Sequence, residues 1–147
     1  MSLRIKFKVV TPERTVFQDE IDQVTLPTTD GEVTVLPNHM PYITVLGSGE
    51  ITLKKDGQES TLAVSGGFVE FNKNEMVVLA DMAERAEEID LQMAEDAKKR
   101  AEELMKQKIT MDESEYALVA AAIEKESARI KVAKKHHSKH APNITSL

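Results

Sequence analysis

His39 is the side chain of this sequence best suited to acid–base chemistry, because imidazole titrates near neutral pH and Asp30 and Glu32 lie close by in the chain. A carboxylate beside a histidine can orient the ring for proton transfer. The sequence supplies no nucleophile, oxyanion donor or metal partner at a recognised spacing around it. Pro37 and Pro41 bracket the histidine instead, which is typical of a stiff loop leaving a sheet. We therefore predict no catalytic residue and interpret His39 as a partly exposed loop residue.

Two other clusters resemble ligand sites. His136, His137 and His140 offer imidazoles, which suit zinc, nickel or copper, but no carboxylate accompanies them. We predict adventitious chelation at most, and therefore no metal site. The Ser-Gly-Gly run at 65–67 could cradle a phosphate only if a helix followed it, and the pattern that follows is that of a strand. The run predicts a tight turn or a bulge.

Composition excludes several classes of protein. A chain of 147 residues allows one ordinary domain, or a small domain with an appendage, and the absence of cysteine excludes disulfides and thiolate metal sites. A net charge of −6 argues against general nucleic-acid binding. No apolar run approaches the roughly 20 residues that span a bilayer, and the amino terminus does not resemble a signal peptide. We expect a soluble or peripheral protein, without nucleic-acid partners and without direct membrane insertion.

Residues 1–84 have the pattern of many short strands. Leu3, Ile5, Phe7 and Val9 alternate with charged residues, which is the period of a strand with one buried face. Further short β-branched segments lie at 15–17, 21–26, 32–36, 42–46, 51–53, 62–64, 68–71 and 75–80. The Asp56-Gly57 pair between two of them is a strong hairpin signal. The pattern predicts an all-β sandwich or flattened barrel of short antiparallel strands as the N-terminal domain.

Residues 85–135 predict a two-helix hairpin. Asp90 is placed to cap the first helix, and Thr110 with Glu113 has the capping-box spacing for the second. The apolar stripes comprise Met93, Ala97, Ala101, Leu104 and Met105 in the first helix, and Tyr116, Val119, Ala120, Ile123, Ser127 and Ile130 in the second. From His136 onward the periodicity ends, and we predict a disordered tail over 136–147.

The two stripes are rich in alanine and poor in leucine, so the helices bury little apolar area. At roughly 25 cal/mol per Å², a small area stabilises the packed state only weakly. Such a hairpin can open, or it can be a stable appendage. The residues alone leave both interpretations open.

Three motifs together resemble the epsilon subunit of the F-type rotary ATP synthase, of the bacterial type. The first is the family segment Gly-Glu-hydrophobic-x-hydrophobic-x-Pro-x-His-x-Pro, here Gly31, Glu32, Val33, Val35, Pro37, His39 and Pro41. The second is Ser-Gly-Gly-Phe-Val-Glu at 65–70, and the third is Val-Val-Leu-Ala-Asp at 77–81. An alanine- and charge-rich helical pair follows them, as in the family. The similarity extends from Ile5 to about Lys135.

The resemblance implies a non-catalytic subunit of the central stalk. Such a subunit couples the gamma shaft to the membrane c ring during proton-driven ATP synthesis, and its mobile C-terminal helices inhibit ATP hydrolysis by the alpha/beta head. The implied location is peripheral, on the cytoplasmic face of the energy-transducing membrane. By resemblance, Asp30, Glu32 and His39 are the candidate residues for the c-ring interface.

Some bacterial members of the family bind ATP through an Ile/Leu-Asp-x-x-Arg-Ala motif at the start of the first terminal helix. This chain has Ile89, Asp90, Met93 and Ala94 at the matching positions. Methionine cannot replace the bidentate phosphate contact of arginine, so we expect no cofactor. A nucleotide-sensing module that closes over a small ligand is the alternative function.

The end of the second helix is basic. Arg129, Lys131, Lys134 and Lys135, with Lys125 before them, recur along or beside one helical surface. In the family, basic residues of this helix face an acidic segment of the catalytic subunits, so the resemblance implies an inhibitory contact with the catalytic head. An ordinary solvated basic face, favoured by the helix dipole, is the alternative.

Overall fold

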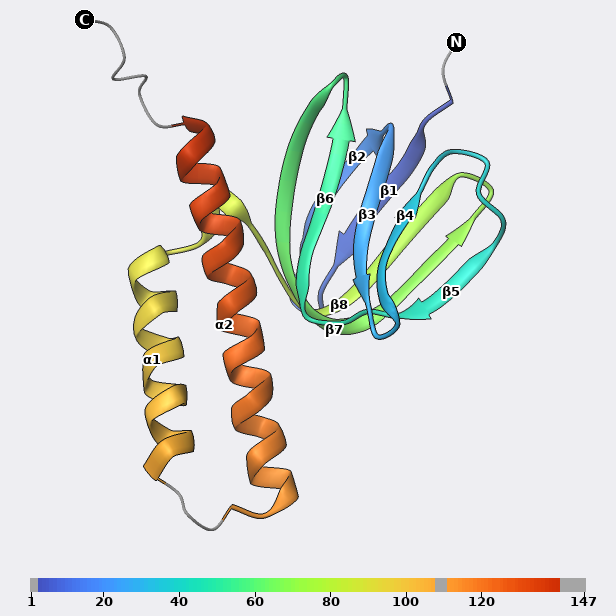
Figure 1. The fold of residues 1–147 in the computed structure, drawn as a ribbon. Coiled ribbons are helices and arrows are strands. Elements are labelled where there is room, and N and C mark those ends of the chain that lie inside the picture. Colours follow the sequence, from blue (N-terminus) through green and yellow to red (C-terminus); the bar gives the residue numbers. More distant parts are fainter. Residues whose placement is uncertain (1–2, 108–110, 141–147) are drawn as a thin grey trace, which may run out of the picture.

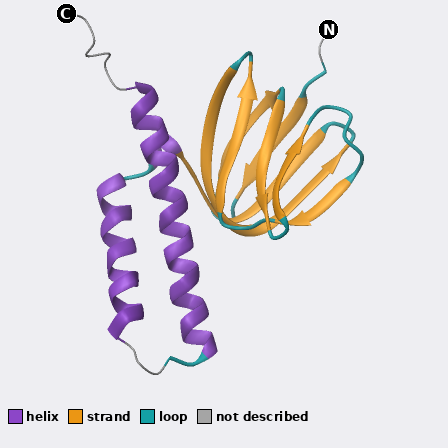
Figure 2. Ribbon diagram, viewed as in Figure 1, coloured by secondary structure: helices purple, strands orange, loops and turns teal. Residues whose placement is uncertain are grey.

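The structure is a computed structural model that describes residues 3–107 and 111–140, a β-sandwich followed by a helical hairpin (Figure 1, Figure 2). The strands are β1 (Ile5–Val10), β2 (Thr15–Ile21), β3 (Gln23–Thr28), β4 (Gly31–Val35), β5 (Tyr42–Val45), β6 (Gly49–Lys55), β7 (Gln58–Asn72) and β8 (Glu75–Arg85). A 3₁₀ turn η1 (Ala86–Glu88), α1 (Leu91–Gln107) and α2 (Glu113–His140) follow. The predicted fold class is confirmed.

The strands form one continuous sheet that closes on itself as a sandwich. Its order is β2-β1-β8-β7-β6-β3-β4, and β5 pairs with β7. All pairings are antiparallel except that of β1 with β8, where Phe7 lies opposite Met76 in a parallel register. The prediction of antiparallel strands alone is therefore wrong at this pair. Local alternation identifies a strand but not its neighbour, and β1 occupies the edge of β8 that β7 leaves open.

β7 is shared between the two layers, and the predicted glycine turn lies inside it. Its first part pairs with β6 and its last part with β5. Ser65 and Gly67 keep one register with Met82 and Ala80 of β8, so the run is neither a turn nor a bulge. A Cβ on Gly67 would lie 1.9 Å from the carbonyl oxygen of Leu79, and its φ is 120°. Glycine is required because the two backbones approach so closely.

The main core lies between the layers of the sandwich. Ile5, Phe7 and Val9 of β1 are buried, as the alternation predicted, and they pack with Phe71 and Met76. Among the described residues, this core contains no side chain from α1 or α2. The sandwich therefore closes on its own side chains, and the helices are added outside it.

The predicted cap of α1 is confirmed, and its predicted stripe is corrected. The Asp90 carboxylate accepts a hydrogen bond from the Met93 amide at 3.0 Å. Ala94 is fully buried, whereas the side chains of Met93 and Leu104 are exposed. The predicted stripe thus included two residues that face solvent.

α2 begins at a different cap and ends later than predicted. The Asp112 carboxylate caps it by accepting a hydrogen bond from the Glu115 amide at 2.8 Å, and the predicted cap Thr110 lies outside the described residues. Tyr116, in the first half of α2, is 56% exposed, and the α2 side chains that pack on the sandwich, Val132 and Ala133, lie in the second half. The helix continues through His140, so the prediction of disorder from His136 is wrong for 136–140, and 141–147 lie outside the described residues.

Candidate functional site

The second half of α2 packs on the sandwich through a small apolar cluster. Val132 and Ala133 of α2 meet Ala63 of β7, together with Ala86 and Ile89 from the segment that leads into α1. Most of these side chains are alanines, so the apolar area is small. Charged contacts surround the cluster and complete the interface.

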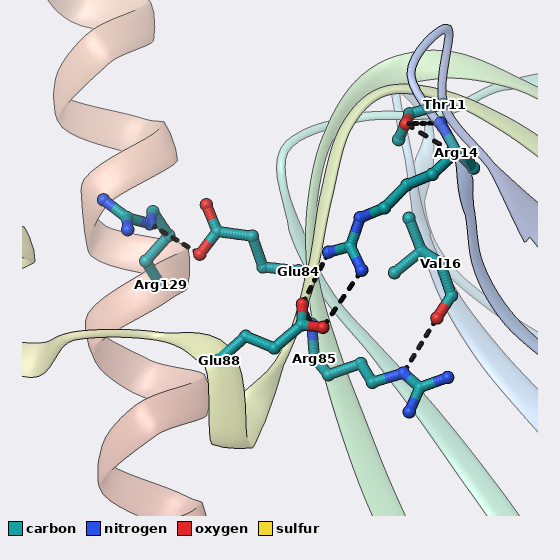
Figure 3. Close-up of polar contacts among 7 residues, drawn as sticks. All are labelled: Thr11, Arg14, Val16, Glu84, Arg85, Glu88 and Arg129. Carbon is teal, nitrogen blue, oxygen red and sulfur yellow. Dashed lines mark hydrogen bonds and ion pairs between the residues drawn. The ribbon is translucent and has the colours of Figure 1, made fainter.

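Arg129 bridges α2 and the end of β8 (Figure 3). Its Nε lies 3.2 Å from Glu84 Oε2, and its Nη1 lies 2.8 Å from Oε2 of Glu126, a buried acid one turn earlier in α2. Burial lowers the pKa of the Arg129 guanidinium, but the hydrogen bond to Glu126 and the charge of Glu84 outweigh it and raise the pKa above its ordinary value. The guanidinium therefore stays charged beneath the helix.

Glu50 of β6 is the second anchor of α2. Its side chain is only 9% exposed, and Oε1 lies 2.6 Å from Lys135 Nζ and 3.4 Å from Lys131 Nζ. Oε2 is buried and has no hydrogen-bond partner among the described residues. A carboxylate covered in this way depends on the two lysines for its stabilisation.

The four predicted basic residues do not form one free surface. Arg129, Lys131 and Lys135 face acids of the sandwich, and Lys134 Nζ lies 3.9 Å from Glu95 of α1. Sequence reasoning missed the partner acids Glu50 and Glu84, because strand alternation turns them outward without indicating that α2 covers them. Glu126 could have been found from its i,i+3 spacing to Arg129.

The four residues at the broken nucleotide motif are not arranged to bind a phosphate group. Ile89 and Ala94 are buried, Asp90 caps α1, and Met93 is 65% exposed. Met93 and Asp90 line an open cavity of about 540 Å³ whose other charged lining residues are Glu13, Arg14, Asp81, Glu84, Glu88 and Arg129. Carboxylates outnumber guanidiniums there, and both arginines are already paired with carboxylates. The cavity therefore has an excess of negative charge and offers no unpaired arginine among its lining residues.

The three predicted ring-contact residues lie at opposite ends of the sandwich. Asp30 and Glu32 lie at the β3–β4 turn, where Glu32 pairs with Pro27 across the hairpin. His39 lies beyond the other end of β4, beside the β7–β8 turn, because the amide of Asn38 donates to Asn74 Oδ1 at 2.6 Å. β4 runs between the two ends in Figure 1. One flat contact cannot include all three side chains.

The two ends also differ in how their side chains are occupied. His39 Nδ1 lies 2.8 Å from the Met40 carbonyl oxygen. The imidazole ring makes T-shaped contacts with the rings of Tyr42 and Phe71, each at 5.8 Å between ring centroids. Asp30 and Glu32 are exposed and form no ion pair with any described residue. The acidic end is therefore free to contact a partner, whereas the imidazole is held within its own loop.

An exposed apolar surface covers the outer face of β5, β7 and β8. Val45 lies opposite Phe68, and Phe68 lies opposite Leu79, with exposures of 44%, 59% and 55%. Ile43, two residues before Val45, is 72% exposed. Adjacent exposed apolar side chains of this size are typical of a protein contact. We call these four residues the apolar row.

Across the part of the chain that the structure describes, no three His, Cys, Asp or Glu side chains are grouped to hold one metal ion. Within residues 3–107 and 111–140, no helix is both long and apolar enough to cross a bilayer.

Comparison with known proteins matches both parts of the chain. Residues 4–86 match the family model of the ATP synthase delta/epsilon chain β-sandwich domain, and residues 87–134 match that of its long α-helix domain. The ATP synthase epsilon chain of Dehalococcoides mccartyi is 45% identical over 90% of this chain and 94% of its own length. That of Chloroflexus aggregans is 40% identical over 92% and 96%.

A solved structure shares the fold. A chain in the cryo-EM structure of the Euglena gracilis mitochondrial ATP synthase matches with a TM-score of 0.74 and 22% identity, over 89% of this chain and 81% of that one. With both family models matched in chain order and bacterial relatives similar over most of its length, this chain belongs to the ATP synthase delta/epsilon chain family and is of the bacterial epsilon type.

Proposed function

We propose that this chain is a non-catalytic subunit of the ATP synthase central stalk, which couples the gamma shaft to the c ring during proton-driven synthesis. We further propose that its C-terminal helices leave the sandwich to restrain ATP hydrolysis by the alpha/beta head. The subunit then lies peripherally on the cytoplasmic face of the membrane.

One observation carries the inhibitory part of this proposal. The cations of α2 are bound by Glu50 and Glu84 of the sandwich, over a floor made mostly of alanine. Arg129 and Lys135 cannot bind these acids and an acidic surface of the head at once. Docking and inhibition therefore exclude each other, and release exchanges one set of acidic partners for another.

The apolar row supports a contact with the gamma shaft. Its four side chains lie on strands, so the sheet holds them rigidly, and no element of this chain covers them among the described residues. We propose that gamma packs on the apolar row. None of the four residues belongs to the apolar cluster or to the ion pairs that hold α2, so the shaft contact does not require release of the helices.

The acidic β3–β4 end supports a contact with polar groups of the c ring. Because His39 lies at the other end of β4, we restrict the proposed ring contact to Asp30 and Glu32.

The variant Asp30→Lys/Glu32→Lys is expected to uncouple the complex. Charge reversal at an exposed turn leaves the sandwich core intact but opposes the ring contact, so membrane vesicles should pump fewer protons per ATP hydrolysed. ATPase activity of the detached head should not change. His39→Ala, at the opposite end, is the matched control and should preserve the pumping ratio. An unchanged ratio in the charge-reversal variant, with the subunit bound, would remove these acids from the coupling contact.

A tagged copy of the chain is expected to copurify with a complete membrane ATPase. The apolar row predicts that Phe68→Glu/Leu79→Glu reduces this recovery strongly, because both charges would be buried without partners at the gamma contact. The control Lys8→Glu, on the polar part of the outer face, should retain assembly. Recovery of the complex with the double variant would show that gamma binds elsewhere.

A further inference from the structure

The chain passes from the sandwich to the helices through a short segment with a break in it. β8 ends at Arg85, the 3₁₀ turn η1 occupies Ala86–Glu88, and Ile89 is extended with φ −80° and ψ 124°. Asp90 then caps α1. The extended residue Ile89 and the cap Asp90 thus separate η1 from α1. A few dihedral changes at these two residues can redirect the helix.

Polar contacts fasten η1 to the loop between β1 and β2 (Figure 3). Arg14 Nη1 and Nη2 donate to the two oxygens of Glu88 at 3.1 and 2.7 Å, a bidentate pair. The Glu88 carboxylate also accepts from the Arg85 amide at 3.3 Å. The Thr11 hydroxyl accepts from the Arg14 amide at 3.3 Å, which steadies the loop that carries the guanidinium.

A second set of contacts holds the end of β8 beside η1. Arg85 Nε donates to the Val16 carbonyl oxygen at 2.8 Å, and its guanidinium lies 5.7 Å from the centre of the Phe17 ring. The hydrogen bond from Arg14 holds the pKa of the Glu88 carboxyl below its ordinary value. Since a carboxyl with a lowered pKa is fully ionised at neutral pH, the pair is complete there and is lost only as the pH falls through that lowered pKa.

These contacts are separate from those that dock α2. Every group in them belongs to the sandwich or to η1, whereas α2 is held through Glu84, Glu50 and the cluster around Val132. Ala86 and Ile89 face that cluster, so release of α2 uncovers one side of η1. The Arg14–Glu88 pair instead joins η1 to the loop between β1 and β2, so it does not depend on α2.

We propose that Arg14 is a positioning residue that keeps η1 on the sandwich when α2 is released, so that the helices swing about Ile89 and Asp90. This inference rests on the proposed release of the helices. The pivot fixes where α1 starts and therefore limits the directions in which the released helices can point. Without the pair, η1 leaves with the helices and the chain pivots earlier, near Arg85.

Distances between spin labels test the pivot in the full chain. The sequence contains no cysteine, so pairs of introduced cysteines are the only label sites. Glu20→Cys on β2 carries the reference label. The distance from it to a label at Glu87→Cys in η1 is called the turn distance, and the distance from it to a label at Lys99→Cys on α1 is called the helix distance. In the release background Glu50→Gln/Glu84→Gln, we expect the helix distance to shift and broaden while the turn distance keeps the distribution of the parent protein.

Removing the guanidinium should free the turn. Adding Arg14→Gln to the release background is expected to broaden the turn distance as well, whereas Lys8→Gln, on the neighbouring strand, should not. Exchange of the two charges, Arg14→Glu with Glu88→Arg, should restore a narrow turn distance, which a general loss of stability would not do. A turn distance that moves together with the helix distance while Arg14 is present overturns the pivot alone. A helix distance that never changes overturns the proposed release, and the pivot with it.

Discussion

Glu50→Gln/Glu84→Gln is expected to lower ATP hydrolysis by the assembled complex, and Arg129→Ala/Lys131→Ala/Lys134→Ala/Lys135→Ala is expected to raise it. The acids hold α2 on the sandwich, so neutralising them releases the helix with its cations intact. The alanine variant also releases the helix but removes the charges proposed to bind the head. Two variants that both break the ion pairs between α2 and the sandwich should therefore have opposite effects on hydrolysis.

The acid variant should shift the balance between docked and released helices by tenfold or more. A hydrogen bond to a charged group contributes about 1.5 to 3 kcal/mol, and about 1.4 kcal/mol is a factor of ten in an equilibrium. The largest single contribution should come from Glu50, which is the more deeply covered acid. A single lysine substitution should have a smaller effect, because Glu50 then keeps the other lysine as a partner.

Steady-state hydrolysis by the purified complex is the measurement, with the subunit quantified in each preparation. Glu20→Gln/Glu75→Gln neutralises two exposed acids that do not contact α2 and should leave hydrolysis unchanged. Truncation after Thr110 should raise hydrolysis as the alanine variant does. A rise in hydrolysis for the acid variant would mean that docked, not released, helices inhibit, and no change in any variant would exclude an inhibitory role.

Gly67→Ala is expected to prevent stable folding of the sandwich. The added Cβ would lie 1.9 Å from the Leu79 carbonyl oxygen, a backbone atom that cannot move without separating β7 from β8. A positive φ of 120° adds strain of about 1 to 3 kcal/mol. We expect the free energy of unfolding to fall by more than about 4 kcal/mol, which is exceptional for one substitution. Such a fall is a large part of the roughly 5 to 15 kcal/mol that stabilises a domain.

Urea unfolding followed by far-ultraviolet circular dichroism measures this loss, and Gly57→Ala is its control. Gly57 also has a positive φ, of 78°, but a Cβ there would meet no atom within 4 Å. The free energy of unfolding of the control should therefore fall only by the strain of a left-handed residue, about 1 to 2 kcal/mol. Equal losses in the two variants would show that backbone strain, and not the contact with β8, makes glycine necessary at 67.

The sequence by itself determined the local features of this protein. Ile5 and Phe7 are buried because a period of two places alternate side chains on one face of any strand, whatever it pairs with. Asp56-Gly57 forms the β6–β7 turn because both residues adopt a positive φ, and Asp90 caps α1 because its carboxylate reaches an amide three residues later. The family segment around His39 likewise identified the family from neighbouring residues.

Only the tertiary structure decided which distant segments meet. The parallel pairing of β1 with β8 and the course of β7 through Gly67 depend on how the sheet closes, which no local period encodes. β4 carries Glu32 and His39 to opposite ends, although the same short motif contains both. Glu50 looks like any outward strand residue until α2 covers it and supplies Lys131 and Lys135, the second of them 85 residues later. Its burial follows from packing between elements, so the anchor of the proposed switch could not be read from the chain alone.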